Sequence, residues 1–257
     1  MRTFIKAIAY YLPERVLDNQ QIANEFPEWT VEKIDKKIGI KKRHITTENE
    51  TAGDMAVKAA EKLFSENKIE RSTIDYLIFV SQSADYFLPT TACLIQERLE
   101  LRADMAAIDI NLGCSGFVYG LSVAKGMILG GMATNVLLLT AETYSKYLHP
   151  RDKSNRTIFG DAAAATLVSA EGIAEIGNFV FGTDGKGADN LVVKTGAARH
   201  RFPMNDLQFD DFGNPRSSDH LYMDGPAILN YSLECIPALV ENVLVKNNLR
   251  IEDVDLH

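Results

Sequence analysis

Disulfides, metal ligands and basic patches are all scarce in this sequence. Three cysteines occur among 257 residues, far apart and odd in number, which excludes a disulfide framework and favours a reducing compartment such as the cytoplasm. The five histidines are scattered, so we predict no bound metal. Acidic residues outnumber basic ones by 35 to 27, the net charge is −8, and no basic stripe is present, so nucleic acid is not an expected partner.

Long hydrophobic runs are missing as well. The N-terminal segment MRTFIKAIAYYLP has neither a long apolar core nor a small-residue cleavage site, which argues against a signal peptide. No apolar run approaches the roughly 20 residues that a membrane-spanning helix needs, so we expect no membrane contact. The composition, 46% hydrophobic and 24% charged, is ordinary for a soluble globular protein with a substantial core.

Apolar segments alternating with helical patterns predict an α/β fold. Several of the expected strands are continuous apolar runs, which are typical of strands buried on both faces. The five candidates are residues 4–10, 76–81, 105–110, 135–141 and 163–169. Helices are expected at 51–67, where Thr51 and Asp54 form a capping-box-like pair, and at 115–130. Pro89 is expected in the first turn of another helix.

Two segments 180 residues apart share a pattern. ENKIERSTIDYL spans 66–77, and KNNLRIEDVDLH spans 246–257. Each follows a long apolar helix, and Pro237 should kink or divide the second one, which we place at 226–245. The repeat predicts two related α/β halves, and the expected domains are 1–172 and 173–257.

The two copies of the repeat continue differently. In the first, Asp75 leads into an expected strand, whereas the sequence stops just after the matching Asp255. We therefore expect a C-terminally truncated chain with an incomplete second half, and an intact mass other than 28.5 kDa would reveal it. A naturally shorter second half is the alternative.

Cys114 is the strongest candidate for a catalytic residue. It lies in NLGCSGF (111–117), between an expected strand and an expected helix. Unpaired N–H groups and the helix dipole at such a position favour the thiolate, which is the nucleophilic form. The small neighbours Gly113 and Gly116 would let an acyl group approach the sulfur closely.

Burial as a small apolar side chain is the alternative for any cysteine. We favour that interpretation for Cys93 and Cys235, which lie inside expected helices. The acidic pair Glu142 and Asp161 is expected to cap or stabilise turns rather than to catalyse.

Six motifs follow one another along the chain. They are YLPERVLDNQQIA (11–23), GIKKRHI (39–45), LPTTACLIQERL (88–99), DINLGCSGFVYGLSVA (109–124), RTIFGDAAAATLV (156–168) and YMDGPAI (222–228). Together they resemble the β-ketoacyl-[acyl-carrier-protein] synthase III family of the thiolase superfamily. The resemblance implies a thiolase-like five-layer α-β-α-β-α sandwich of two duplicated halves, here with the second half incomplete, and a homodimer.

The resemblance also implies a reaction that begins fatty acid or polyketide-like synthesis. Cys114 would accept the acyl group of an acyl-CoA as a thioester, and malonyl-acyl carrier protein would then be decarboxylated and attack it. Both reactants are substrates, so no cofactor is expected. The backbone N–H of Cys114 would contribute to the oxyanion hole.

The family triad also contains a histidine and an asparagine. By spacing from Asp255 the histidine falls at position 260, so His257 is not assigned. A polypeptide ending at 257 is expected to be incompetent for condensation and to retain, at most, a less efficient acylation of Cys114.

Five further residues match substrate-binding positions of the family. Trp29 and Lys33 stand where a tryptophan and an arginine clamp the adenine of CoA, and lysine stacks less well than arginine. Lys153, with Arg151 nearby, stands where an arginine contacts a CoA phosphate. Leu88 matches a position that reaches the acyl tunnel of the partner subunit. The alternatives are a solvated loop for the cations and core packing for Leu88.

Three functions therefore stay open. The first is condensation of an acyl-CoA with malonyl-acyl carrier protein. The second is acyl transfer to another acceptor, which the altered adenine clamp would favour. The third is a catalytically incomplete partner of an active homologue, against which the intact Cys114 speaks.

Overall fold

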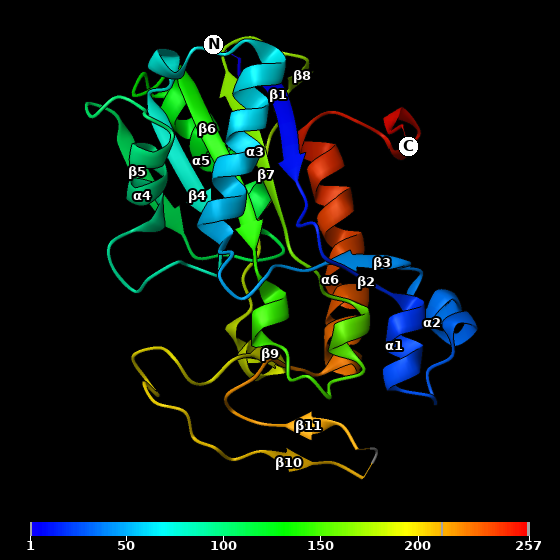
Figure 1. The fold of residues 1–257 in the computed structure, drawn as a ribbon. Helices are drawn as coiled ribbons and strands as arrows, with labels where there is room; N and C mark the ends of the chain where they lie inside the picture. The colour runs from blue at the N-terminus through cyan, green and yellow to red at the C-terminus, as the bar shows by residue number, and fades with distance from the viewer. Residues whose placement is uncertain (1, 212, 256–257) are drawn as a thin grey trace. The chain divides into compact units, whose positions relative to one another are not determined.

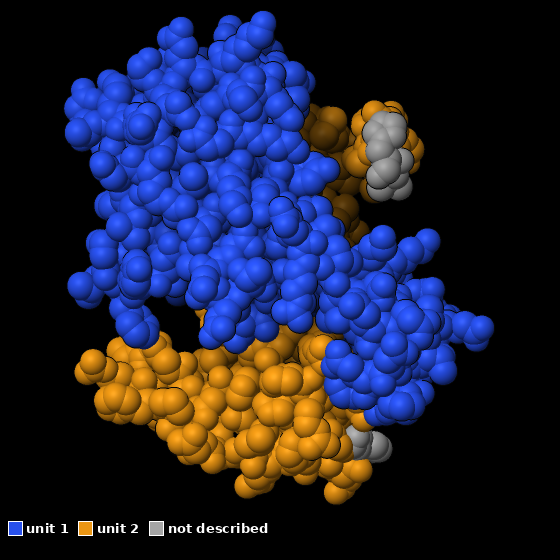
Figure 2. Space-filling view, in the orientation of Figure 1, with its two compact units in different colours: residues 1–146, 157–176 blue, residues 147–156, 177–257 orange. Residues whose placement is uncertain are grey.

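A computed structural model describes residues 2–211 and 213–255. The chain divides into two compact units, which Figure 2 colours separately. The first comprises residues 1–146 and 157–176, and the second comprises residues 147–156 and 177–257. The domains predicted from the repeat, 1–172 and 173–257, stay a prediction about related halves, because compactness does not test relatedness.

The first unit is built on a six-stranded mixed sheet in the order β5-β4-β6-β7-β1-β8 (Figure 1). Its strands are β1 (Phe4–Tyr11), β4 (Tyr76–Val80), β5 (Ala106–Ile110), β6 (Asn135–Glu142), β7 (Ala162–Ser169) and β8 (Ala174–Glu175). Its main helices are α3 (Ala52–Asn67), α4 (Thr91–Arg98) and α5 (Gly116–Leu129). All five predicted strands are present, and the α/β fold class is confirmed.

The central strands are buried on both faces, as their apolar runs predict. Leu77 and Phe79 of β4 belong to the cluster that contains α3 and α4, whereas the alternate residues Ile78 and Val80 are buried outside it. Successive side chains of a strand point to opposite faces, so both faces of the sheet must be covered. In Figure 1, α3 crosses in front of the sheet and α5 lies behind it.

The connections between the parallel strands place several loops at one edge of the sheet. β4 pairs in parallel with both β5 and β6. Helix α4 connects β4 to β5, and helix α5 connects β5 to β6. Parallel strands end at the same edge, where α/β proteins commonly bind their ligands.

The elements that follow β1 in the chain form a smaller cluster of their own. It contains β2 (Val16–Asp18), α1 (Asn19–Glu25), α2 (Val31–Ile38) and β3 (Lys42–His44). β2 pairs antiparallel with β3, and Leu17, Ile22 and Ile34 form the buried centre. Asp18 forms a capping box with Gln21 at the start of α1, which is why the helix begins there.

The second unit has little sheet. It contains the paired strands β9 (Leu191–Val192) and β12 (Tyr222–Met223), the hairpin of β10 (Gln208–Phe209) and β11 (Pro215–Arg216), and the helix α6 (Gly225–Lys246). Across both units, short 3₁₀ helices lie at Arg71–Thr73, Tyr144–Tyr147, Asn155–Thr157, Gly185–Asn190 and Ile251–Asp253.

The repeat has a structural counterpart. The side-chain amide of Asn67 donates to the backbone carbonyl of Leu63 at 3.0 Å, and the side-chain amide of Asn247 donates to the backbone carbonyl of Val243 at 2.8 Å. The next residues adopt left-handed backbone conformations, with φ of 53° and 56°, at Lys68 and Asn248. A short 3₁₀ helix follows in both copies. The two segments therefore end their helices in the same way.

Helix α6 requires two corrections. Pro237 does not divide it, since the helix is continuous from Gly225 to Lys246; a proline removes one helical hydrogen bond, and the turns on both sides supply the others. A kink at Pro237 stays a prediction. The helix is also long and apolar enough to cross a membrane by length and composition, contrary to the expectation from the sequence. One such helix is weak evidence for a membrane protein.

Candidate active site

Cys114 lies in the turn between β5 and α5, as predicted. The turn is closed by the N–H of Gly116, which donates to the carbonyl of Gly113 at 2.8 Å. Gly116 is the first residue of α5, so Cys114 stands two positions before the helix. Its side chain is exposed, which excludes burial as the reason for a cysteine here. Its environment combines solvent access with the positive end of a helix dipole.

The other two cysteines differ from the prediction. Cys93 is exposed rather than buried, because α4 turns Thr91, Ala92 and Ile95 toward the core and leaves residue 93 on the other side. Cys235 is partly exposed, and its thiol donates to the carbonyl of Tyr231 at 2.6 Å.

The glycines beside Cys114 have a packing role. A β-carbon at Gly116 would overlap a methyl group of Val80 on β4. A β-carbon at Gly113 would lie 2.5 Å from Oε1 of Gln82 and 3.3 Å from the hydroxyl oxygen of Tyr144. The turn therefore lies close to the side chains of Val80, Gln82 and Tyr144 at the ends of β4 and β6.

Gln82 and Tyr144 lie just after those neighbouring strands, and neither was predicted from the sequence. Gln82 follows β4 and Tyr144 follows β6, and the Tyr144 hydroxyl donates to Oε1 of Gln82. Their positions directly after two expected strands could have indicated them. β4 is parallel to β5 and β6, so the loops that follow these strands lie at the same edge of the sheet.

Glu142 holds the turn that carries Gln82. Its carboxylate accepts the Gln82 N–H at 2.8 Å and the Ser83 hydroxyl at 2.7 Å. Burial, opposed by these two hydrogen bonds and reinforced by the charge of Asp161, raises the pKa of Glu142. Both contacts are with the turn after β4, as the expected turn-stabilising role requires.

Asp161 is a buried carboxylate whose oxygens accept several hydrogen bonds. It is 2% exposed and accepts the Thr46 N–H at 2.7 Å, the Thr46 hydroxyl at 2.8 Å, the Ser145 N–H at 2.9 Å and the Ser145 hydroxyl at 2.5 Å. It thereby joins the loops after β3 and β6 to the start of β7. The expected structural role for Asp161 is confirmed.

Trp29 and Lys33 lie next to each other at the start of α2. The Lys33 ammonium is 5.1 Å from the centre of the Trp29 ring, and it donates to the carbonyl of Glu28 at 2.9 Å. Trp29 also packs partly buried against the cluster around Ile34. The pair is thus assembled as a cation–π contact, and its role toward CoA stays a prediction.

Leu88 is 82% exposed, and its neighbours Tyr86 and Phe87 are exposed as well. Core packing within this chain is therefore excluded as the role of Leu88.

Pro89 lies before α4 rather than in its first turn, because the helix begins at Thr91 after the N-cap Thr90.

Arg151 and Lys153 lie in the second unit, in the loop of residues 147–156. The Arg151 guanidinium is 4.5 Å from the centre of the Phe209 ring on β10. The Arg151 N–H donates to Nδ1 of His149 at 3.1 Å, and the His149 ring meets the His220 ring edge-on at 4.8 Å. Arg151 is thus exposed but contacts an aromatic ring, and the roles of Arg151 and Lys153 toward CoA stay predictions.

Protonation of His149 should weaken the second unit. Burial, followed by the charges of His220 and Arg151 and opposed by Asp152, lowers the pKa of His149 below its ordinary value of 6.5. As the pH falls through this value the unfolded chain binds a proton before the folded chain does, so stability declines. We expect His149→Phe, which keeps an aromatic ring, to reduce the melting-temperature difference between about pH 7.5 and about pH 5.5 by roughly 1–2 °C. An unchanged difference in thermal unfolding scans would contradict this.

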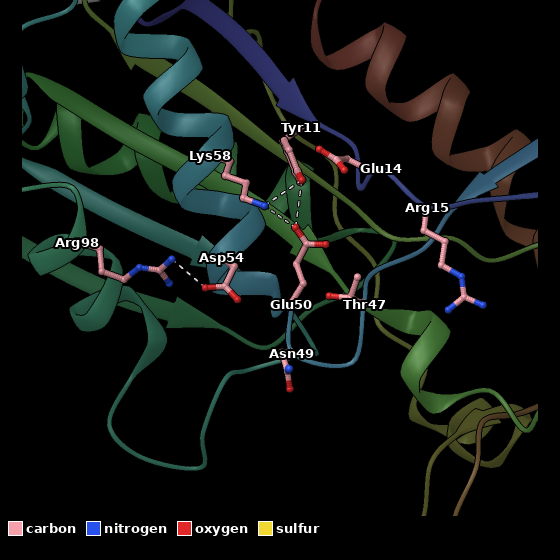
Figure 3. Close-up of a pocket in the computed structure, with 9 residues that line it drawn as sticks. All are labelled: Tyr11, Glu14, Arg15, Thr47, Asn49, Glu50, Asp54, Lys58 and Arg98. Atoms are coloured by element: carbon pink, nitrogen blue, oxygen red, sulfur yellow. Dashed lines mark hydrogen bonds and ion pairs between the residues drawn. The ribbon is translucent and has the colours of Figure 1, made fainter.

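A polar pocket of about 420 Å³ lies elsewhere on the first unit (Figure 3). The Lys58 ammonium contacts Glu50 at 2.7 Å and the Tyr11 hydroxyl at 2.9 Å, and Arg98 pairs with Asp54 at 2.8 Å. Most of its charges are thus satisfied within the chain, which indicates a structural ion-pair cluster. In residues 2–211 and 213–255, no group of three or more His, Cys, Asp or Glu side chains could hold a metal ion.

The chain is similar in sequence and in structure to known proteins. A model of the family described as 3-oxoacyl-[acyl-carrier-protein (ACP)] synthase III matches residues 108–185, which include Cys114. A beta-ketoacyl-[acyl-carrier-protein] synthase III of Clostridium perfringens strain 13 is 33% identical over 95% of this chain and 72% of its own length. The chain belongs to the 3-oxoacyl-[acyl-carrier-protein] synthase III family.

Other synthase III proteins agree. A putative 3-oxoacyl-[acyl-carrier-protein] synthase 3 of Campylobacter jejuni is 35% identical over 89% of this chain, which spans only 65% of that relative's length. A crystal structure of a 3-oxoacyl-(acyl-carrier-protein) synthase III is 47% identical, with a TM-score of 0.96 over 99% of this chain and 77% of the other. The fold is therefore the thiolase-like α/β fold of the synthase III family. Truncation and the five-layer arrangement stay predictions.

Proposed function

We propose that this synthase III chain uses Cys114 as an acyl-accepting nucleophile in the condensation of an acyl-CoA with malonyl-acyl carrier protein. The observation that supports this most is the exposed Cys114 turn, within the segment that the family model matches. The turn follows a parallel strand and precedes a helix, which is a recurrent setting for nucleophiles.

The proposed chemistry has two steps. The Cys114 thiolate attacks the acyl carbonyl, a carbon–sulfur bond forms, and the CoA thiolate leaves and takes up a proton. Malonyl-acyl carrier protein then loses CO₂, and its carbanion attacks the acyl-cysteine, which releases the Cys114 thiolate. Splitting the reaction in this way replaces one difficult carbon–carbon bond formation with two easier displacements.

The remaining predicted residues would bind the substrates. Trp29 and Lys33 would contact the adenine of CoA, and Arg151 with Lys153 would contact its phosphates. Leu88, exposed in this chain, would enter the acyl tunnel of a second copy in a homodimer. A cytoplasmic location fits soluble acyl-CoA and acyl carrier protein substrates.

Incubation with a series of radiolabelled acyl-CoAs tests the first step. We expect label on the peptide containing Cys114 and none on those containing Cys93 or Cys235. Absence of label with every acyl-CoA would overturn the proposal.

Adding malonyl-acyl carrier protein then separates the two enzymatic functions by product mass. A β-ketoacyl product supports condensation, whereas discharge of the acyl group to another acceptor supports the alternative that Lys33 in the adenine clamp favours.

A further inference from the structure

A chain of contacts connects the Phe159–Gly160–Asp161 turn to Cys114. Asp161 accepts both the N–H and the hydroxyl of Ser145, which fixes the segment directly after β6. The adjacent Tyr144 ring lies 5.2 Å from the Phe159 ring. Both sides of Tyr144 are thus anchored to one turn at the start of β7.

Tyr144 in turn holds Gln82. Its hydroxyl donates to Oε1 of Gln82, while the Gln82 N–H is held by Glu142 at 2.8 Å. The turn after β4 is fixed further because the Ser83 hydroxyl donates to Glu142 at 2.7 Å and accepts the Thr143 N–H at 3.1 Å. The Gln82 side chain therefore has a defined position between the ends of β4 and β6.

Gln82 lies beside the residue that precedes the nucleophile. A β-carbon built on Gly113 would lie 2.5 Å from Oε1 of Gln82, so the glycine backbone and the Gln82 side chain are close neighbours. On the other side of Cys114, a β-carbon at Gly116 would overlap a methyl group of Val80. The turn that carries Cys114 is thus flanked by one polar and one apolar side chain.

We infer that Gln82 and Tyr144 are positioning residues for Cys114, and that the Phe159–Gly160–Asp161 turn acts on the nucleophile through them. The inference rests on the proposed role of Cys114 as the nucleophile. Small displacements of a nucleophile have large kinetic consequences, because the reacting atoms must meet at a defined distance and angle. Neither residue is required to contact the substrate.

Two conservative variants test the inference. Tyr144→Phe removes only the hydroxyl and keeps the ring on Phe159. We expect the maximal rate of Cys114 acylation to fall about tenfold, with the KM for acyl-CoA unchanged within about twofold. Tyr10→Phe is the matched control, because Tyr10 is 58% exposed on β1, and its acylation should equal that of the wild type. An unchanged rate in Tyr144→Phe would overturn the inference.

A second measurement needs no acyl-CoA. The rate of Cys114 alkylation by iodoacetamide is compared in the same sample with that of Cys93, which is also exposed but lies on α4. Gln82→Leu removes the acceptor of the Tyr144 hydroxyl beside the Cys114 turn, so the rate of Cys114 alkylation should change by about threefold or more while that of Cys93 stays fixed. An unchanged Cys114 rate would overturn the inference, even if Tyr144→Phe fails to fold. Wild-type protein that no acyl-CoA acylates would instead refute the proposed function and leave the alkylation result to decide the positioning role.

Discussion

Cys114→Ala should abolish acylation of this chain, with a loss of the order of a thousandfold or more. The variant removes the sulfur that would form the thioester, and the structure describes Cys114 as exposed, so its loss leaves no core cavity. The free energy of unfolding should therefore stay close to that of the wild type. Acylation is measured as the mass increment of one acyl group on the intact protein.

Cys93→Ala is the matched control for Cys114. Both thiols are exposed, but Cys93 lies on the outer side of α4 rather than at the start of a helix. Full acylation of Cys93→Ala together with none of Cys114→Ala would locate the nucleophile. Acylation that survives in Cys114→Ala would place it elsewhere.

Asp161→Ala should be among the most destabilising substitutions in the first unit. The carboxylate is 2% exposed and accepts four hydrogen bonds from Thr46 and Ser145. Its removal leaves buried donors without a partner, at a cost of about 3 kcal/mol or more. The resulting fall in melting temperature is roughly 6–12 °C.

A second variant at position 161 separates charge from hydrogen bonding, and a variant at Asp104 serves as the control. Asp161→Asn keeps one acceptor oxygen and introduces an N–H₂ group among donors, so its urea-unfolding midpoint should lie between those of wild type and Asp161→Ala. Asp104→Ala removes a carboxylate whose side chain is 78% exposed and should leave the midpoint unchanged. An Asp161→Ala midpoint equal to that of Asp104→Ala would show that the network contributes nothing to stability.

Loss of the Asp161 network should also affect Cys114. Asp161 holds Ser145 beside Tyr144, and Tyr144 contacts Gln82 at the Cys114 turn. A folded Asp161→Asn variant should thus show slower acylation as well as lower stability. The two readouts connect a structural carboxylate with the proposed nucleophile.

Local patterns in the sequence determined the elements of the first unit. The run YLIFVS predicts a buried strand, and β4 occupies Tyr76–Val80. The pair Thr51 and Asp54 predicts a helix start, and both hydrogen bonds of the capping box are present. Such features depend on neighbours in the chain, namely side-chain periodicity and hydrogen bonding within one turn. The strand–turn–helix position of Cys114 followed from the same local signals, whereas its exposure came from the structure.

Tertiary structure alone decided which side chains surround that turn. Gln82, Gly113 and Tyr144 are separated by tens of residues, and only the parallel pairing of β4 with β5 and β6 brings them together. The exposure of Cys93 was likewise missed, because a helical residue can face either core or solvent until its helix is packed. The sequence by itself thus determined the local elements, the family resemblance and the candidate nucleophile. The contacts that hold this nucleophile required the sheet order, since they join residues that no local pattern connects.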